Sequence, residues 1–343
     1  MNAAKPLVLL DPYPRTNAMI FRPAERARLE SLANVITVEG GAVPDDVVEA
    51  CLPNVTAILG QTALPARRLA LASHLRAVLN VEGNLFPNID YAACFSRGIR
   101  VGSAAPAFAR SVAEYALTLA LDLIRGVSQA DRAFRANTER YGWRGNVGVE
   151  SLFDAELGII GFGNIARALV PLLRPFGCTV RVFDPWLPDS VLREQGVIPA
   201  PLNDILSLSR LVFVLAAPTS ENQHFIGAPE MARMRRGAGL VLLSRADVVD
   251  YAALQISLAA GHICAAIDVF PQEPLAPDHP LRGCETAILS SHRAGGLNST
   301  LTAIGDMAVD DLALILRGLP PVRMQYAQPE TVGLLRSTPG LKS

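Results

Sequence analysis

The stretch ELGIIGFGNIARALVPLLRPFG at residues 156–177 decides the fold class of this 343-residue chain. It begins as a continuous apolar run, passes through Gly161 and Gly163, and continues as an amphipathic helix pattern. A strand that runs through closely spaced glycines into a helix is typical of a dinucleotide-binding unit. Gly161 permits the tight turn, Gly163 lets a pyrophosphate approach, and Ala166 stands where a small residue allows close helix packing. The stretch therefore predicts a parallel α/β sheet with a phosphate-binding loop at its edge.

Taken alone, this glycine pattern is weak evidence, because ordinary tight turns also use glycine. The next predicted strand, TVRVFD, ends in Asp184, 18 residues after Ala166. A carboxylate at about this distance can accept hydrogen bonds from both ribose hydroxyls and would repel a 2′-phosphate. Asp184 therefore favours NAD over NADP, unless it merely starts an Asp-Pro turn.

Apolar runs alternate with helix-like patterns along most of the chain. The runs are continuous rather than alternating, which indicates strands buried on both faces of parallel, doubly wound sheets. The length favours two domains. A long helix over 111–125 leads into the second series, and a last helix over 299–318 is expected to return to the first domain. Strands are predicted at 6–11, 55–60, 75–81, 99–103, 156–163, 179–184, 210–218, 239–245, 263–270 and 286–291.

Composition excludes several classes of function. The formal net charge is −1 and the basic residues are dispersed, so neither a nucleic acid nor a membrane surface is an expected partner. The most apolar helix candidate carries Glu114 and Asp122 and is too short to span a bilayer. No signal peptide is expected at the N-terminus. The five scattered cysteines lack a C-x-x-C pair, which argues against disulfides and a metal site and for a cytoplasmic protein.

Three chemically distinct side chains follow neighbouring predicted strands. Arg245 ends GLVLLSR, Glu273 follows AAIDVF closely, and His292 follows TAILSS. Ligands of parallel sheets bind outside the carboxyl ends of the strands. A guanidinium can bind a carboxylate through two parallel hydrogen bonds. An imidazole beside a carboxylate can deliver a proton to a carbonyl oxygen as hydride arrives at its carbon, so a 2-oxo acid suits the set.

Each of these residues also has a structural alternative. Arg245 could cap a strand, and Glu273 could be a solvated loop acid. Asp268 is either a buried acid at a strand end or a partner of the nicotinamide carboxamide. The other four histidines, His74, His224, His262 and His279, are expected in loops or near helix ends.

From about residue 50 to 320 the chain resembles the D-isomer-specific 2-hydroxyacid dehydrogenases. Eight segments carry the resemblance in chain order: NIDYAACFSRGIRV, SVAEYALTLAL, GIIGFGNIARAL, VFDP, LAAPTSENQHFIG, LLSRADVVDYAAL, AAIDVFPQEPLAPDHPL and LSSHRAGG. The resemblance implies Arg245, Glu273 and His292 as the catalytic set, with Glu273 orienting His292. It also implies Asp184 on the adenosine ribose and a homodimer formed through the cofactor domain.

The resemblance further implies two Rossmann-like or flavodoxin-like domains with a cleft between them. Residues 1–103 and 297–343 would form the substrate-binding domain, and 104–296 the NAD-binding domain. The substrate is expected to contact Arg245, His292 and the loop residues Glu82, Gly83 and Asn84. The cofactor is expected to contact Gly161, Phe162, Gly163, Asn164, Ile165, Asp184, Pro185, Ala217, Pro218, Asn222, Ser244, Asp268 and Ala294.

Two departures from the family pattern concern the substrate loop. The family often has Gly-x-Gly-x-Asp before NID, but in this chain Leu85 replaces the second glycine and Pro87 the acid. These changes leave the catalytic groups in place and put the identity of the substrate in doubt.

The leading functional hypothesis is an NAD-dependent dehydrogenase of 2-oxo and D-2-hydroxy acids. The alternative from another class is an NAD(H)-sensing, corepressor-like protein on the same scaffold, since fold does not fix function. A second enzymatic alternative is an enzyme of the same family that oxidises formate or phosphonate. A phosphoglycerate enzyme with a regulatory tail is less favoured, because only about 25 residues follow the last predicted helix.

Overall fold

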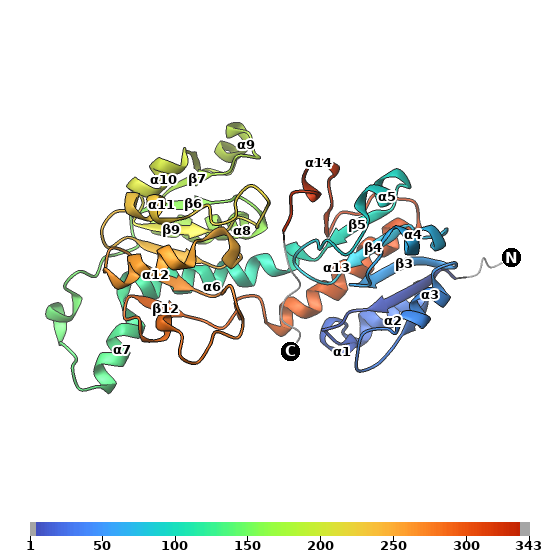
Figure 1. Ribbon diagram of the computed structural model, residues 1–343, viewed down its shortest axis with the longest axis horizontal. Coiled ribbons are helices and arrows are strands. Elements are labelled where there is room, and N and C mark those ends of the chain that lie inside the picture. Colours follow the sequence, from blue (N-terminus) through green and yellow to red (C-terminus); the bar gives the residue numbers. More distant parts are fainter. Residues whose placement is uncertain (1–4, 337–343) are drawn as a thin grey trace. The chain divides into compact units, whose positions relative to one another are not determined.

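The computed structural model describes residues 5–336 and divides the chain into two compact units. The first unit holds the described residues up to Phe108 together with those from Gly296 onward, and the second holds Ala109–Gly295 (Figure 1). The predicted substrate domain also takes in residues 1–4 and 337–343, which lie outside the described residues. The long helix α6 (Ala105–Arg125) begins in the first unit and continues into the second.

The first unit is built on a six-stranded sheet in the order β13-β5-β4-β3-β1-β2. All neighbours pair in parallel except β13, which is antiparallel to β5. The order of its five parallel strands is that of the flavodoxin-like doubly wound sheet. The strands are β1 (Leu7–Asp11), β2 (Asn34–Thr37), β3 (Val55–Gly60), β4 (Ala77–Asn80), β5 (Arg100–Ser103) and β13 (Gln325–Tyr326).

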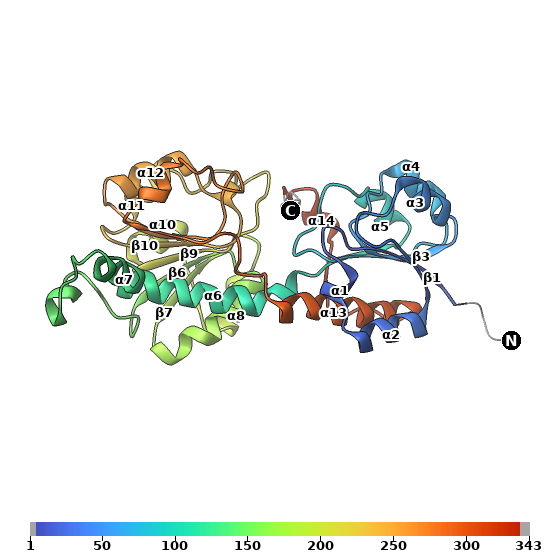
Figure 2. The ribbon, with the colours of Figure 1, turned by 90° about the horizontal axis from the view of Figure 1, so that it is seen from below.

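Helices cover both faces of this sheet. In Figure 2, α2 and α13 lie on one face and α3, α4 and α5 on the other. Successive side chains of β1 point to opposite faces, so Val8 and Leu10 pack toward α13 while Leu9 packs toward α3. The helices are α1 (Asn17–Ile20), α2 (Pro23–Leu32), α3 (Asp45–Cys51), α4 (Ala66–Leu71), α5 (Tyr91–Ser96), α13 (Asn298–Leu316) and α14 (Pro329–Val332).

A buried carboxylate on α13 holds the segment that leads into β13. Asp311 is 0% exposed and accepts hydrogen bonds from the backbone N–H groups of residues 322–324 at 2.8–3.1 Å. It also accepts one from the Tyr326 hydroxyl at 2.9 Å. Burial, with the neighbouring Asp311 charge, raises the pKa of Tyr326 well above its ordinary value, so this hydroxyl stays a donor. The segment is therefore fixed by charge-assisted bonds to one side chain.

The second unit is built on a seven-stranded parallel sheet in the order β12-β11-β10-β9-β6-β7-β8. The chain order reverses direction between β6 and β9, which is the switch point where doubly wound sheets bind ligands. The strands are β6 (Glu156–Ile160), β7 (Thr179–Phe183), β8 (Ile198–Pro199), β9 (Leu211–Val214), β10 (Gly239–Leu242), β11 (Cys264–Ile267) and β12 (Ala287–Leu289).

This sheet is also covered on both faces. Figure 2 shows α10, α11 and α12 on one face, and α6 and α8 on the other. The first three helices share a buried apolar cluster with β9, β10 and β11. The remaining bounds are α7 (Val127–Arg135), η1 (Gly142–Asn146), α8 (Asn164–Leu173), η2 (Arg174–Phe176), α9 (Asp189–Glu194), α10 (Leu202–Leu208), α11 (Ala228–Arg233), η3 (Ala246–Val248), α12 (Tyr251–Ala259) and η4 (Pro280–Gly283).

The predicted fold class, two α/β units with parallel doubly wound sheets, is confirmed. Several element bounds were wrong. The strand predicted at 210–218 ends at Val214, because the apolar run continues into the following loop, and the helix predicted from 111 begins at Ala105. The predictions also omitted β2, whose four residues are half-exposed or exposed and form no buried run. None of the helices between residues 5 and 336 combines the length and apolarity that a membrane span requires.

Candidate active site

The glycine loop joins β6 to α8 as the sequence predicts. Gly161 has φ +88°, and a Cβ there would lie 2.6 Å from the backbone of Ala216, so the position requires glycine. Gly163 is different, because a Cβ built on it meets no atom within 4 Å. It caps α8 at the switch point of the sheet, where N–H groups of the first turn can receive an anion. The open space above Gly163 therefore fits a pyrophosphate.

Asp184 follows β7 and is bonded to this loop. Its Oδ2 accepts the Phe162 N–H at 2.7 Å, and its Oδ1 accepts the Trp186 N–H at 2.9 Å. A carboxylate has about four acceptor positions, so two such bonds leave capacity for ribose hydroxyls. The structure thus brings Asp184 beside the glycine loop, as a dinucleotide site requires.

The cofactor residues predicted after β9 form a closed loop. The Asn222 side chain donates to the Ala217 carbonyl at 2.8 Å and accepts the Thr219 N–H at 2.7 Å. Pro218 lies inside the loop that this amide closes. The Asn222 side chain therefore holds the conformation of this loop.

After β10, Ser244 carries an orphaned polar atom. The residue is 7% exposed, and its buried Oγ has no hydrogen-bond partner among the described residues. Buried hydroxyls are normally paired, so this one fits a site where a ligand supplies the partner. The next residue, Arg245, donates from Nη1 to the Ser244 carbonyl at 2.7 Å. With the open space at Gly163, this orphan supports the fit of a dinucleotide at this edge.

His292 and Glu273 meet directly. The Nδ1 atom of His292 lies 2.7 Å from Oε2 of Glu273, while Oε1 accepts the Phe270 N–H at 2.8 Å. Burial acts to raise the pKa of Glu273, but the hydrogen bonds from His292 and Phe270 and the charges of His292 and Arg245 hold it below its ordinary value. The carboxylate is therefore ionised throughout the neutral range and orients the imidazole.

Asp268 follows β11 and is buried at the strand end. It is 1% exposed and accepts bonds from the Ser290 hydroxyl and from the backbone N–H groups of Arg293 and Ala294. These donors all belong to the loop around His292. Sequence reasoning missed Ser290 and its neighbour Tyr115, because nothing in the strand pattern indicates their hydrogen bonds.

The substrate loop lies in the first unit, where local contacts hold its Glu82 side chain and its backbone at Asn84. Glu82 forms an ion pair with Arg15 at 2.5 Å, and the Asn84 carbonyl accepts from Asn80 at 3.2 Å. A Cβ built on Gly83 would lie 3.3 Å from the Phe108 ring. Arg15 was also missed, since it lies far away in the sequence and belongs to no predicted motif. Within residues 5–336, no group of three or more His, Cys, Asp or Glu side chains could hold a metal ion.

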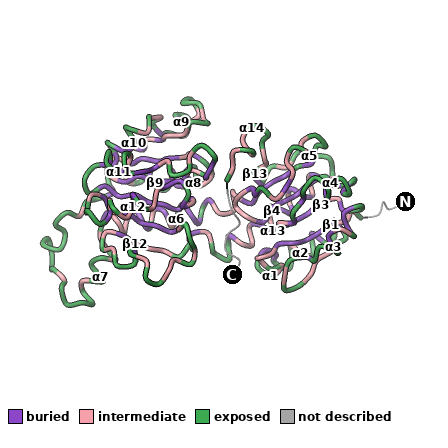
Figure 3. The backbone as a smooth tube through the Cα atoms, in the orientation of Figure 1, coloured by how far each residue is buried: buried purple, intermediate pink, exposed green. Residues whose placement is uncertain are grey.

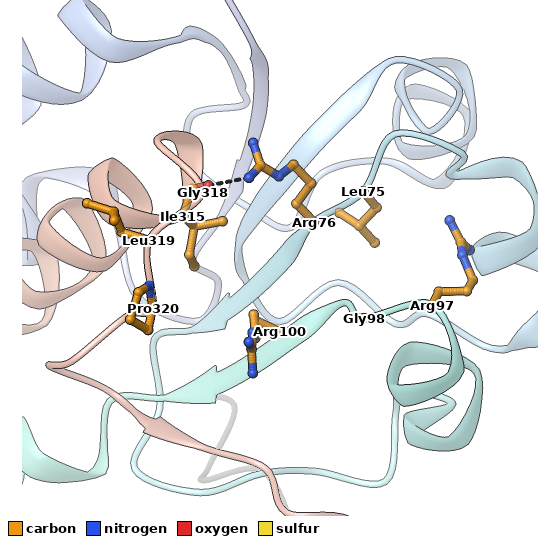
Figure 4. Close-up of a pocket in the computed structure, with 9 residues that line it drawn as sticks. All are labelled: Leu75, Arg76, Arg97, Gly98, Arg100, Ile315, Gly318, Leu319 and Pro320. Atoms are coloured by element: carbon orange, nitrogen blue, oxygen red, sulfur yellow. Dashed lines mark hydrogen bonds between the residues drawn. The ribbon is translucent and has the colours of Figure 1, made fainter.

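The first unit also holds a pocket of about 420 Å³ (Figure 4). Its arginines, Arg76, Arg97 and Arg100, lie at the opposite, amino-terminal edge of β4 and β5. Arg76 donates to the Ile315 carbonyl at the end of α13, and Arg97 donates to the Leu69 carbonyl of α4. The guanidinium groups of Arg76 and Arg97 offset the negative ends of α13 and α4, which explains these two without a ligand.

Comparisons with known proteins identify the family of this chain. A family model described as the NAD-binding domain of D-isomer specific 2-hydroxyacid dehydrogenases matches residues 117–294. A glyoxylate reductase of Korarchaeum cryptofilum is 33% identical over 69% of this chain and 72% of its own length. A D-3-phosphoglycerate dehydrogenase of Methanocaldococcus jannaschii is 30% identical over 67% of this chain but only 44% of its own length.

The similarity extends to a solved structure over nearly the whole chain. The crystal structure of a phosphoglycerate oxidoreductase from Rhizobium etli has a TM-score of 0.85 and 44% identity, and the match covers 96% of this chain and 100% of the other. The predicted resemblance is thereby confirmed. With its glycine loop and the paired His292 and Glu273, the chain belongs to the D-isomer specific 2-hydroxyacid dehydrogenase family, whose members are NAD-binding oxidoreductases.

Proposed function

We propose that this protein interconverts a 2-oxo acid and a D-2-hydroxy acid by NAD-dependent hydride transfer. The observation that carries the proposal is the 2.7 Å pairing of His292 with Glu273 after strands of the sheet that also carries the glycine loop. Membership of the family supports the same reaction class and does not favour the sensor alternative. We expect the loop that holds Glu82, Gly83 and Asn84, which departs from the usual family pattern, to determine which 2-oxo acid is bound.

In this proposal each side chain has one task. A bound nicotinamide supplies or accepts the hydride. The Arg245 guanidinium binds the substrate carboxylate through two parallel hydrogen bonds and so fixes the neighbouring carbonyl. Glu273 accepts the Nδ1–H of His292, which leaves Nε2 to give its proton to the carbonyl oxygen during reduction. In oxidation the neutral ring takes the hydroxyl proton at the same nitrogen.

A panel of 2-oxo acids with NADH tests the reaction. Glyoxylate and the 2-oxo acid that corresponds to 3-phosphoglycerate belong in the panel because relatives are named after these compounds. Apolar and hydroxylated 2-oxo acids complete it. We expect NADH oxidation with at least one of them, and chiral chromatography should show the D configuration for every product with a stereocentre; glycolate, the product from glyoxylate, has none. Tight NADH binding without turnover of any member would instead favour the sensor alternative.

We propose that NAD rather than NADP is the physiological cofactor, because Asp184 stands beside the glycine loop. Asp184→Ala is expected to weaken NADH binding by roughly 10-fold or more, since hydrogen bonds to a charged group are lost. Removing the negative charge should at the same time improve NADPH binding. Fluorescence titrations with NADH and with NADPH give the ratio of their two Kd values. Asp189→Ala, which removes an exposed carboxylate paired with Arg193, serves as the control, and an unchanged ratio in Asp184→Ala would contradict the proposal.

We propose a homodimer formed through the second unit. A run of large apolar side chains is exposed along α7, η1 and their flanks, and no residue of α7 is buried (Figure 3). A concentrated apolar surface of this kind marks a protein interface. Light scattering should give twice the chain mass of 36.6 kDa, and Trp143→Glu should shift it toward the monomer. The exposed set is Val127, Phe134, Tyr141, Trp143 and Val147.

We further propose that the protein works in a reducing compartment, the cytoplasm. All five cysteines are free thiols in the structure. Disulfides persist mainly in oxidising compartments, so their absence among these residues is consistent with this assignment. Detection of the protein with cytoplasmic markers after cell fractionation is the expected result, and recovery in the secreted fraction would contradict it.

A further inference from the structure

The backbone of the His292 loop adopts a conformation that needs support. His292 has φ 51°, in the left-handed region that side chains other than glycine rarely adopt. Such a residue is unfavourable and persists only where surrounding contacts over-determine its conformation. The proposed acid/base is thus held in an unfavourable conformation by something nearby.

Asp268 supplies most of that support. Its carbonyl accepts the His292 N–H at 2.8 Å, and its carboxylate accepts the N–H groups of Arg293 and Ala294, each at 3.1 Å. Three consecutive backbone N–H groups, beginning at His292, therefore point to one buried residue. Rotation of the Asp268 carboxylate would release two of them at once.

Two hydroxyl groups fix the orientation of that carboxylate. The Ser290 hydroxyl donates to Oδ1 of Asp268 at 2.5 Å. Because its single proton is used there, the hydroxyl of Tyr115 on α6 must donate in the 2.8 Å bond between Tyr115 and Ser290. The result is a chain of hydrogen bonds from Tyr115 through Ser290 to Asp268, separate from the Glu273 contact that orients the imidazole ring.

We propose that Tyr115 and Ser290 are positioning residues for His292, which act in series through Asp268. The inference rests on the proposed function, since it assigns them to the acid/base of that reaction. Neither side chain touches the reacting groups in this scheme. They hold the Asp268 carboxylate, and this carboxylate holds the backbone that aims the imidazole.

The serial arrangement predicts the pattern of a double-mutant cycle. Tyr115→Phe and Ser290→Ala should each lower kcat by about tenfold, with the Kd for NADH changed little. The double variant should be no slower than Ser290→Ala, because Tyr115 acts only through the serine hydroxyl. Ser290→Thr, which keeps a hydroxyl, should recover most of the rate. Multiplicative losses in the double variant would overturn the serial order.

A matched control separates positioning from general destabilisation. Tyr326→Phe also removes a tyrosine hydroxyl bonded to a buried aspartate, Asp311, but it lies in the first unit, whereas His292 belongs to the second. It should lower the melting temperature while leaving kcat unchanged. If Tyr115→Phe lost activity only in proportion to its melting temperature, as a merely structural residue would, the proposal would be wrong.

A second readout does not depend on turnover. In nitrogen-15 NMR spectra, the His292 ring should show one preferred tautomer in the unmodified protein and averaged signals in Tyr115→Phe and Ser290→Ala. If no 2-oxo acid is reduced, the proposed function fails, yet these spectra still test the positioning of the ring. Unchanged His292 signals in both variants would overturn the further inference, whether or not the enzyme turns over.

Discussion

Replacing His292 with alanine is expected to lower kcat by about 10²–10⁴-fold, the usual contribution of a positioned acid or base. Glu273 orients the His292 imidazole through a contact of 2.7 Å. Alanine at this position leaves the pair without its proton donor. NADH binding should change little, because the glycine loop and Asp184 are untouched. Steady-state kinetics with the best 2-oxo acid of the panel, and a fluorescence titration with NADH, measure the two effects.

The control for this variant is His74→Ala, an exposed histidine of the first unit. It should leave both kcat and NADH binding unaltered. Glu273→Gln should fall between the two, since it keeps the shape of the side chain but loses the charge that stabilises the imidazolium. Full turnover by His292→Ala would refute the assignment of the acid/base and leave the family's reaction to another residue.

Replacing Asp311 with alanine is expected to destabilise the first unit by about 3 kcal/mol or more, because it leaves backbone N–H groups of residues 322–324 and the Tyr326 hydroxyl without their acceptor. A loss of this size lowers the melting temperature by roughly 6 °C or more in a unit of this length. Calorimetry should show a lower melting temperature only in the transition of the first unit. NADH should still raise the melting temperature of the second unit.

The neighbouring Asp310→Ala provides the comparison. Asp310 also forms ion pairs, with Arg28 and Arg323 at 2.6 and 2.5 Å, but its side chain is 28% exposed. Exposed pairs contribute about 0–1 kcal/mol, so this variant should be nearly as stable as the unmodified protein. Equal losses of stability from Asp310→Ala and Asp311→Ala would show that the buried hydrogen bonds of Asp311 contribute no more than the ion pairs of Asp310.

The parts of the fold predicted correctly from the sequence are those with dense local signals. Continuous apolar runs predict β1, β3 and β6 because these strands are buried on both faces. The short strands β2 and β13 give no such signal. Their residues are at most half-buried, and their positions depend on pairing with strands that are distant in the sequence.

The candidate site also has features that the sequence predicts and features that it does not predict. Arg245, Glu273 and His292 follow strands of one parallel sheet, so topology alone brings them to one edge. The donors to Asp268, the positive φ of His292 and the pairing of Arg15 with Glu82 could not be predicted. They depend on side-chain directions in loops, which composition and periodicity do not encode.

The discontinuous first unit has a consequence for the order in which a newly made chain can fold. Its apolar cluster beneath β1, β3 and β4 is completed by Ile304, Leu312 and other side chains of α13, which the ribosome delivers after the entire second unit. During translation α2 can already cover part of that face (Figure 2), but the area that α13 covers stays exposed while residues 109–295 emerge and can fold by themselves. The amino-terminal strands are synthesised first, yet their core closes last, and this interval is when the nascent protein most needs protection by chaperones.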